Sequence, residues 1–370
     1  MRLQFEVIPH LLKFRFEAGT SRGSFTEKET WLIKVWKKGN PDCVGWGEAS
    51  PLKGLSIDYS PNYETELQTL LNKLSALDFP EETEDLLEFI AANTPIEKPS
   101  VRFGLETALL DLHNGGKRII FDTPFTQGKA RIPINGLIWM GEKSFMQRQI
   151  DEKLKEGYNT IKLKIGAIDF ATELALLEGI REQYSANDIT LRVDANGAFT
   201  EADAMHKLEE LAALEIHSIE QPVKPHQYEL MKRLCEESPL AIALDEELIG
   251  VNAKEDKKAL LERFQPQFII LKPALLGGIL SCQEWIEIAE SLNIGWWMTS
   301  MLEANIGLNA IAQFTAQYQP TLPQGLGTGQ LYYNNIDSPL EIRKGELLYN
   351  KVRGWGDFPQ SNLKSDSISS

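Results

Sequence analysis

The segment from Thr160 to Ser300 decides the fold, and it is a series of short apolar runs that each end in a charged or polar residue. The run ends read TIKLK at 160–164, TLRVDAN at 190–196, HSIEQP at 217–222, ALDE at 243–246, FIILKP at 268–273 and MTS at 298–300. Successive ends lie 25 to 30 residues apart, which suits one strand, one helix and two short loops. The spacing therefore predicts an α/β fold, a modified (β/α)8-type barrel similar to a TIM barrel.

The rest of the chain extends this prediction to a second domain. Residues 1–125 combine strand-like alternation with helical patterns, and they predict an N-terminal α+β capping domain to which residues 331–358 return. The barrel is expected over 126–330. Strands are expected at 3–8, 13–16, 30–36, 44–48 and 132–138, with an eighth barrel strand end at 324–329. Helices are expected at 63–77, 81–92 and from Ser100 onward, and residues 360–370 are expected to form a disordered tail.

Composition excludes several classes of protein. A formal net charge of −15 disfavours non-specific nucleic-acid binding. The first 20 residues have no signal-peptide pattern, and no segment is apolar enough to span a bilayer. Cys43, Cys235 and Cys282 are far apart and predict free thiols in a reducing compartment. We expect a cytoplasmic protein with no membrane or nucleic-acid partner; its oligomeric state is left open.

Two lysines at the end of the first run are candidate catalytic groups. Residues two apart on a strand point the same way, so Lys162 and Lys164 face the barrel interior while Ile161, Leu163 and Ile165 face the surrounding helices. Like charge and desolvation both lower the pKa of a lysine. We therefore expect a depressed lysine pKa here and a lysine general base.

Three carboxylates end the next runs and are candidate metal ligands. Asp194, Glu220 and Asp245 would repel one another if they met unpaired, and a hard divalent cation removes that repulsion. Oxygen-only ligands indicate Mg²⁺, with Mn²⁺ as the alternative, rather than Zn²⁺. Asn196 and Glu246 are expected to hold these ligands in place.

Lys272 is expected to approach the metal site from the side opposite Lys164. A base, a metal and an opposed cation suit removal of a proton from a carbon next to a carboxylate. The sequence therefore predicts an enzyme that acts on a small-molecule carboxylate.

These motifs give the chain a specific resemblance. It resembles the enolase superfamily, muconate-lactonising subgroup, over nearly its whole length, and lysine bases with Mg²⁺ are established chemistry in that superfamily. The matching stretches are Gly45–Glu48, Arg102–Asp111, Lys162–Lys164, Asp194–Asn196, Glu220–Pro222, Asp245–Glu246 and Lys272 with Gly277–Gly278.

Within the subgroup the chain is most similar to the synthases that dehydrate a succinyl-hydroxycyclohexadiene carboxylate to an aromatic product in menaquinone biosynthesis. That similarity rests on Gly19–Gly23, Arg192, Thr299–Glu303, Asn305–Leu308 and Gly325–Gly329. It implies that Lys164 removes the proton and then assists loss of the hydroxyl, that Lys272 stabilises the anion, and that Lys162 holds Lys164. It also implies substrate contacts by Ser21, Arg22, Arg192, Ser300 and Gly325. Composition alone favours a solvated hairpin tip at 19–23 over a closing loop.

Two other functions stay open at this point. An N-succinylamino-acid racemase or dipeptide epimerase of the same fold would use Lys272 to reprotonate the opposite face. Dipeptide epimerases hold the substrate ammonium with an acidic pair near the eighth strand, and residues 324–330 contain no carboxylate. The second is a non-catalytic relative, which usually lacks a ligand or base, whereas this chain has them all.

Overall fold

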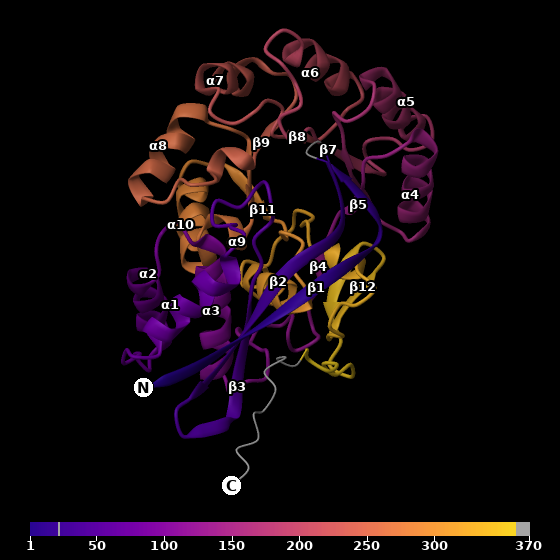
Figure 1. Ribbon diagram of the computed structural model, residues 1–370. Coiled ribbons are helices and arrows are strands. Elements are labelled where there is room, and N and C mark those ends of the chain that lie inside the picture. The colour runs from indigo at the N-terminus through magenta and orange to yellow at the C-terminus, as the bar shows by residue number, and fades with distance from the viewer. Residues whose placement is uncertain (21–22, 360–370) are drawn as a thin grey trace.

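A curved parallel sheet ringed by helices lies beside a smaller antiparallel sheet in the computed structural model (Figure 1). The structure describes residues 1–20 and 23–359. The predicted tail at 360–370 and the predicted substrate contacts Ser21 and Arg22 lie outside the described residues.

The antiparallel sheet begins the chain and is built from long strands. β1 (Leu3–Thr20) pairs with β2 (Gly23–Lys37), which pairs with β3 (Asn40–Ala49). The predicted strands at 3–8 and 13–16 are one element, because β1 continues through a register shift between Lys13 and Ala18. The far end of this hairpin extends toward the barrel (Figure 1), where Gly19 bridges Met140.

Helices cover one face of this sheet. They are α1 (Tyr63–Leu74), α2 (Thr83–Asn93) and α3 (Pro99–His113). α3 lies directly on β3: a Cβ added to Gly47 would lie 1.9 Å from the carbonyl oxygen of Gly104. Because the two backbones approach so closely, position 47 of the Gly45–Glu48 stretch has space only for glycine.

The parallel sheet has the strand order that the spacing predicts. Its order is β11-β10-β9-β8-β7-β6-β5, so strands that follow one another in the chain are neighbours in space. The strands are β5 (Gly136–Ile138), β6 (Thr160–Lys164), β7 (Thr190–Asp194), β8 (Ser218–Glu220), β9 (Ile242–Leu244), β10 (Phe268–Leu271) and β11 (Gly295–Met298).

Helices fill the connections and form the outer ring (Figure 1). They are α4 (Lys143–Lys155), α5 (Phe170–Arg181), α6 (Ala204–Ala213), α7 (Tyr228–Glu237), the 3-10 turn η1 (Glu246–Leu248), α8 (Lys254–Phe264), α9 (Pro273–Leu276), α10 (Gly278–Ser291) and α11 (Asn305–Ala316). Ile161, Leu163 and Ile165 are fully buried in the apolar core with residues of these helices, such as Leu176. The lysines between them point to the opposite face.

The closing segment of the barrel differs from the prediction. Gln324 and Gly325 do not form a strand; they join the edges of the sheet through single bridges, Ile134 to Gln324 and Thr299 to Gly325. The glycines of this segment and the 3-10 turn η2 (Thr328–Gln330) end the pairing there. The predicted strand at 132–138 is also divided, into β4 (Ile132–Pro133) and β5.

The C-terminal segment contacts both parts of the molecule. Tyr332 bridges Phe14 of β1, and Ile336 packs with Ile8 and Leu32. Beyond it, β12 (Leu340–Arg343) and β13 (Glu346–Tyr349) form a small sheet with β4. Among the described residues, no helix combines the length and the apolar character that crossing a membrane requires.

Candidate active site

The register of the parallel sheet places the predicted residues at one level. Lys164 pairs with Asp194, and Asp194 pairs with Glu220. Asp245 follows β9 directly, and Lys272 follows β10. The carboxyl ends of parallel strands meet at one edge of the sheet, so these side chains converge there.

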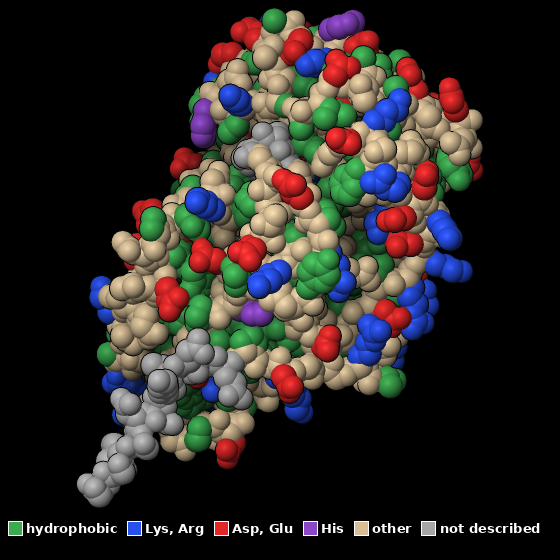
Figure 2. Space-filling view, turned by 45° about the vertical axis from the view of Figure 1, so that its right-hand side comes forward, with side chains coloured by type: hydrophobic (Ala, Val, Ile, Leu, Met, Phe, Trp, Pro, Cys, Tyr) green, Lys and Arg blue, Asp and Glu red, His purple; other side chains and the backbone are tan. Residues whose placement is uncertain are grey.

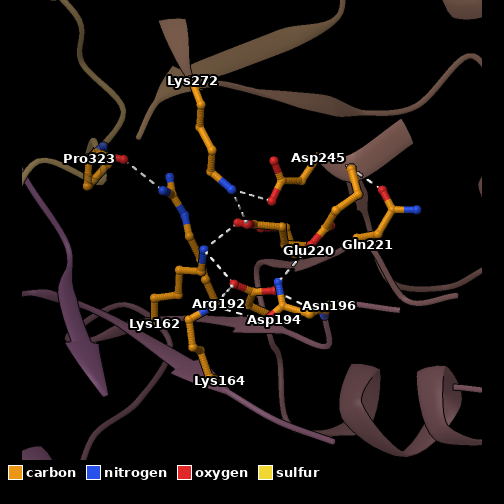
Figure 3. Close-up of polar contacts among 12 residues, drawn as sticks. Lys162, Lys164, Arg192, Asp194, Asn196, Glu220, Gln221, Asp245, Lys272 and Pro323 are labelled. Carbon is orange, nitrogen blue, oxygen red and sulfur yellow. Dashed lines mark hydrogen bonds and ion pairs between the residues drawn. The ribbon is translucent and has the colours of Figure 1, made fainter. Parts of the chain in front are cut away.

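The lysines and carboxylates alternate across the site (Figure 3). Lys164 Nζ donates to Asp194 Oδ2 at 2.8 Å and to Asn196 Oδ1 at 3.0 Å. Lys162 Nζ lies 3.0 Å from Asp194 Oδ2 and donates to Glu220 Oε2. Lys272 Nζ donates to Asp245 Oδ2 and lies 3.8 Å from Glu220 Oε1. Lys164 and Lys272 therefore lie on opposite sides of the carboxylates, with Glu220 between them.

Charge pairing rather than repulsion sets the pKa of two lysines here. Burial opposes the ammonium form, but the Asp194 and Glu220 carboxylates outweigh it and raise the pKa of Lys162. Burial is likewise outweighed at Lys272, where Asp245 and Glu220 raise the pKa. Burial also opposes the charged form of Asp194, yet Lys162 and Lys164 lower the pKa of this carboxyl. The expectation of a depressed pKa was wrong for Lys162, because it counted the neighbouring lysine and not the facing carboxylates.

The predicted metal ligands offer oxygen donors in a buried setting. Asp194, Glu220 and Asp245 are each at most 2% exposed, and Glu220 Oε1 is buried with no hydrogen-bond partner. A buried carboxylate oxygen that accepts no hydrogen bond fits a cation-binding role. As the described side chains stand, however, no group of three acidic, histidine or cysteine residues is placed to hold a metal ion. Lysine ammonium groups lie between the neighbouring carboxylates instead.

Neighbouring amides hold these carboxylates in position. Asn196, in the left-handed region at φ +44°, donates its backbone N–H to Asp194 Oδ1 and its side-chain amide to Glu246 Oε1, both at 3.1 Å. Gln221 Oε1 accepts the backbone N–H groups of Asp245 and Glu247. Gln221 belongs to the Glu220–Pro222 stretch, and only the fold shows that it connects the end of β8 to the end of β9.

A cavity of about 300 Å³ lies over these groups and has two unlike halves. Lys162, Lys164, Asp194, Asn196, Glu220 and Lys272 form the charged half. The other half is apolar and comes from the β1–β2 hairpin, the loop after β3, the loop after β5 and α4; it includes Phe16, Phe25, Leu52, Leu55, Trp139 and Phe145. No sequence pattern predicts this half, because its residues are single apolar side chains from distant segments. On the face shown in Figure 2, acidic and basic side chains are interspersed.

Two of the three described residues predicted to contact the substrate line the cavity. Ser300 and Gly325 are on its wall, and the Ser300 hydroxyl is hydrogen-bonded to Thr328. Arg192 is not part of the lining. Its guanidinium is buried below the site, 4.0 Å from the Trp297 ring centroid, and donates to the Pro323 carbonyl at 2.7 Å. Burial lowers the pKa of Arg192 to about 10. Arg192 thus contacts Trp297 and Pro323 beneath the site, and not the cavity itself.

Comparison with known proteins places this geometry in context. Residues 146–358 match the family described as enolase C-terminal domain-like. The chain is 49% identical to an o-succinylbenzoate synthase of Desulfotalea psychrophila, over 91% of this chain and 96% of the relative. A crystal structure of MenC from Desulfotalea psychrophila aligns with a TM-score of 0.84 at 45% identity, covering 94% of this chain and all of that one. An N-succinylamino acid racemase of Thermus thermophilus is 29% identical over 90% of this chain and 88% of the relative.

Proposed function

This chain belongs to the enolase C-terminal domain-like family, and from that premise we propose that it acts as an o-succinylbenzoate synthase of menaquinone biosynthesis. The reaction is dehydration of 2-succinyl-6-hydroxy-2,4-cyclohexadiene-1-carboxylate, so the enzyme is a carbon–oxygen lyase. The observation that carries the proposal is the position of Lys164 and Lys272 on opposite sides of three buried carboxylates (Figure 3). The relative at 49% identity supports the choice of substrate.

Lys164 is the proposed base. In its neutral form, Nζ takes the proton from the ring carbon that bears the carboxylate, and the electron pair of the C–H bond moves into that carboxylate. The C–O bond to the ring hydroxyl then breaks, and the hydroxyl leaves as water with the proton that Lys164 had taken. Lys164 returns to its neutral form, and the ring becomes aromatic. Its position between Asp194 and Asn196 holds Nζ toward the cavity.

The other two lysines have supporting roles in this proposal. Lys272 is buried beside Asp245 and Glu220, on the side of the site opposite Lys164, and as an ammonium it faces the developing negative charge as a fixed cation. Lys162 connects Asp194 to Glu220 and holds the Lys164 side of the site in place.

We propose that Asp194, Glu220 and Asp245 hold Mg²⁺, or Mn²⁺ as an alternative ion. The Glu220 Oε1 atom that accepts no hydrogen bond and the all-oxygen donor set support this proposal. When bound, such an ion supplies positive charge to the substrate carboxylate and so makes the neighbouring C–H bond more acidic. Asn196 and Glu246 would support the Asp194 side of this group.

The apolar half of the cavity suits the hydrocarbon ring of this substrate. Phe16, Phe25, Leu52, Leu55 and Trp139 can bury the ring against carbon surface while the carboxylate faces the charged half. Ser300 and Gly325 are the described candidates for contacts to the polar succinyl group. We further propose that residues 1–125 form the capping domain, that 126–330 form the barrel, and that the enzyme works in the cytoplasm.

An N-succinylamino-acid racemase is the second candidate, because both lysines are present on opposite sides as two-base exchange requires. A dipeptide epimerase is disfavoured, since the cavity wall at Gly325, Gly327, Thr328, Gln330 and Leu331 offers no carboxylate for a substrate ammonium.

One experiment separates these candidates. The purified protein with Mg²⁺ receives the cyclohexadiene substrate and, separately, N-succinylamino acids in D₂O. The proposal predicts rapid loss of the diene absorbance that requires Lys164. Deuterium incorporation into the amino acid without loss of the diene would favour the racemase, and diene loss that is unchanged in Lys164→Ala would refute the mechanism.

A further inference from the structure

Two carboxylates from the N-terminal part of the chain are buried against the barrel, outside the catalytic cavity. Glu48 is at the end of β3 and is 0% exposed, and Glu106 is on α3 and is 1% exposed. Neither lines the cavity. Burying a carboxylate costs free energy unless its oxygens accept hydrogen bonds, so the partners of these two groups show what they do.

Glu106 accepts hydrogen bonds at the beginning of α10. Its carboxylate takes the backbone N–H groups of Ile279 and of Leu280, the latter at 3.4 Å. Gly278 lies under the carboxylate, where an added Cβ would be 2.1 Å from Glu106 Oε2. The free N–H groups at a helix N-terminus carry positive partial charge and favour an oxygen acceptor there, while burial raises the pKa of Glu106 to about 8.

This contact is close in the chain to Lys272. The backbone carbonyl of Lys272 begins the short helix α9, because it accepts the N–H groups of Leu275 and Leu276. Gly277 and Gly278, at φ +97° and +94°, then turn the chain directly into α10. α9 also packs against α3. The Glu106 contact therefore fixes the far end of the short connection that carries the Lys272 backbone.

Glu48 makes the equivalent contact at α11. Its Oε1 accepts the Ala304 N–H at 2.7 Å and its Oε2 accepts the Gly307 N–H at 2.8 Å. The four residues before Glu303, from Thr299 to Leu302, line the cavity and include Ser300. Glu48 thus fixes the end of a segment that shapes the substrate side of the site and carries no proposed base.

We propose that Glu106 and Glu48 are positioning residues of the N-terminal part of the chain: Glu106 fixes the segment that carries Lys272, and Glu48 fixes the segment that carries Ser300. The assignment of different kinetic effects to them rests on the function proposed above. Loss of Glu106 displaces the fixed cation and lowers kcat, whereas loss of Glu48 loosens the wall that holds the substrate and raises KM.

Asp111 supplies a matched control on the same helix as Glu106. It is 0% exposed and also accepts two backbone N–H groups, from Trp46 at 2.9 Å and from Arg118. Both donors lie outside the barrel sheet and its cavity. Removing its charge damages the same kind of buried contact, at two donors that carry no proposed catalytic or substrate-contacting side chain.

The test compares Glu106→Gln, Glu48→Gln and Asp111→Asn well below their melting temperatures. We expect kcat of Glu106→Gln to fall about 10- to 100-fold with KM within about threefold, because small misplacements of a catalytic group have effects of that size. Glu48→Gln should raise KM about tenfold and keep kcat within about threefold. That result is expected when a variant loses an interaction that binds the substrate and the transition state equally well. Asp111→Asn should lower the melting temperature and leave both constants within about threefold. Equal losses in all three variants would overturn the proposal.

Amide hydrogen exchange tests the same claim without substrate, so its failure is distinct from failure of the proposed function. Faster exchange is expected at 273–282 in Glu106→Gln and at 300–308 in Glu48→Gln, with neither change in Asp111→Asn. Uniformly faster exchange in all variants would contradict local positioning. If Glu106→Gln does not fold, Gly278→Ala disturbs the same contact from the barrel side and should speed exchange at 273–282.

Discussion

The two halves of the cavity are built in opposite ways. In the charged half, every residue lies in a barrel strand or just after one, and each ammonium faces a carboxylate. In the apolar half, single side chains arrive from the hairpin, two loops and α4. In the proposed function, the first half carries the reaction and the second half holds the substrate. Variants in the two halves should therefore differ in kind as well as in size.

The largest effect is expected for Lys164→Ala. Removal of the proposed general base should lower kcat about 10⁴-fold, with a smaller change in KM. The diene absorbance assay measures it. Lys153→Ala is the control. Lys153 also lines the cavity but pairs with Glu156, directly after α4, so this variant should keep kcat within about threefold. A Lys164→Ala enzyme as active as this control would remove the distinction between the halves.

The next effect concerns the carboxylates. Glu220→Gln should lower kcat about 10³-fold, since it removes a charge that faces Lys162, Lys272 and the proposed cation. Removal of divalent ions with a chelator should abolish turnover, and Mg²⁺ or Mn²⁺ should restore it. Full activity after exhaustive chelation, verified by elemental analysis, would rule out the metal.

A smaller effect of another kind is expected in the apolar half. Phe25→Ala should raise KM about 10- to 100-fold and change kcat little, because burial of a phenyl group contributes about 1.5–3 kcal/mol of binding. Tyr333→Ala removes an exposed aromatic ring outside the cavity and should change neither constant. A loss confined to kcat in Phe25→Ala would mean that the apolar half takes part in the chemistry.

The smallest effect is on stability, and it concerns two buried acids whose pKa values shift in opposite directions. The pKa of Asp194 is lowered by the lysines around it, whereas burial, together with Glu48, raises the pKa of Glu303, next to the cavity residue Leu302, to about 7. In the folded protein, Glu303 binds its proton more tightly than an unfolded glutamate does. This difference contributes fully to the free energy of unfolding below about pH 4.5, and the contribution is lost as the pH rises to about 7. Between pH 5 and 7 the free energy of unfolding should therefore fall less steeply in Glu303→Gln, by about 1 kcal/mol per pH unit. Parallel denaturant titrations of both proteins measure this, and identical slopes would contradict it.

The contrast between the halves also explains what the sequence could predict. Regular spacing of strand ends is a local pattern, so the barrel and the meeting of Lys164, Asp194, Glu220, Asp245 and Lys272 at one edge could be predicted. The raised pKa of Lys162 could not, because it depends on which carboxylate each ammonium faces. Phe25, Trp139 and Phe145 have no common sequence signal, since only the fold brings them together. The absence of an eighth strand at 324–329 and the position of Arg192 beneath the site likewise depend on tertiary contacts.

The central claim is that the amine of Lys164 moves the proton, and replacement of that amine tests it most directly. Lys164→Cys is assayed with the cyclohexadiene substrate before and after alkylation with 2-bromoethylamine, which rebuilds an amine of nearly the same length. Alkylated wild-type protein controls for reaction at Cys43, Cys235 and Cys282. The mechanism predicts a loss of at least about 10³-fold in the variant and recovery of more than about tenfold on alkylation. A variant that keeps its activity, or one that stays inactive after alkylation at position 164 is complete by mass, would contradict it.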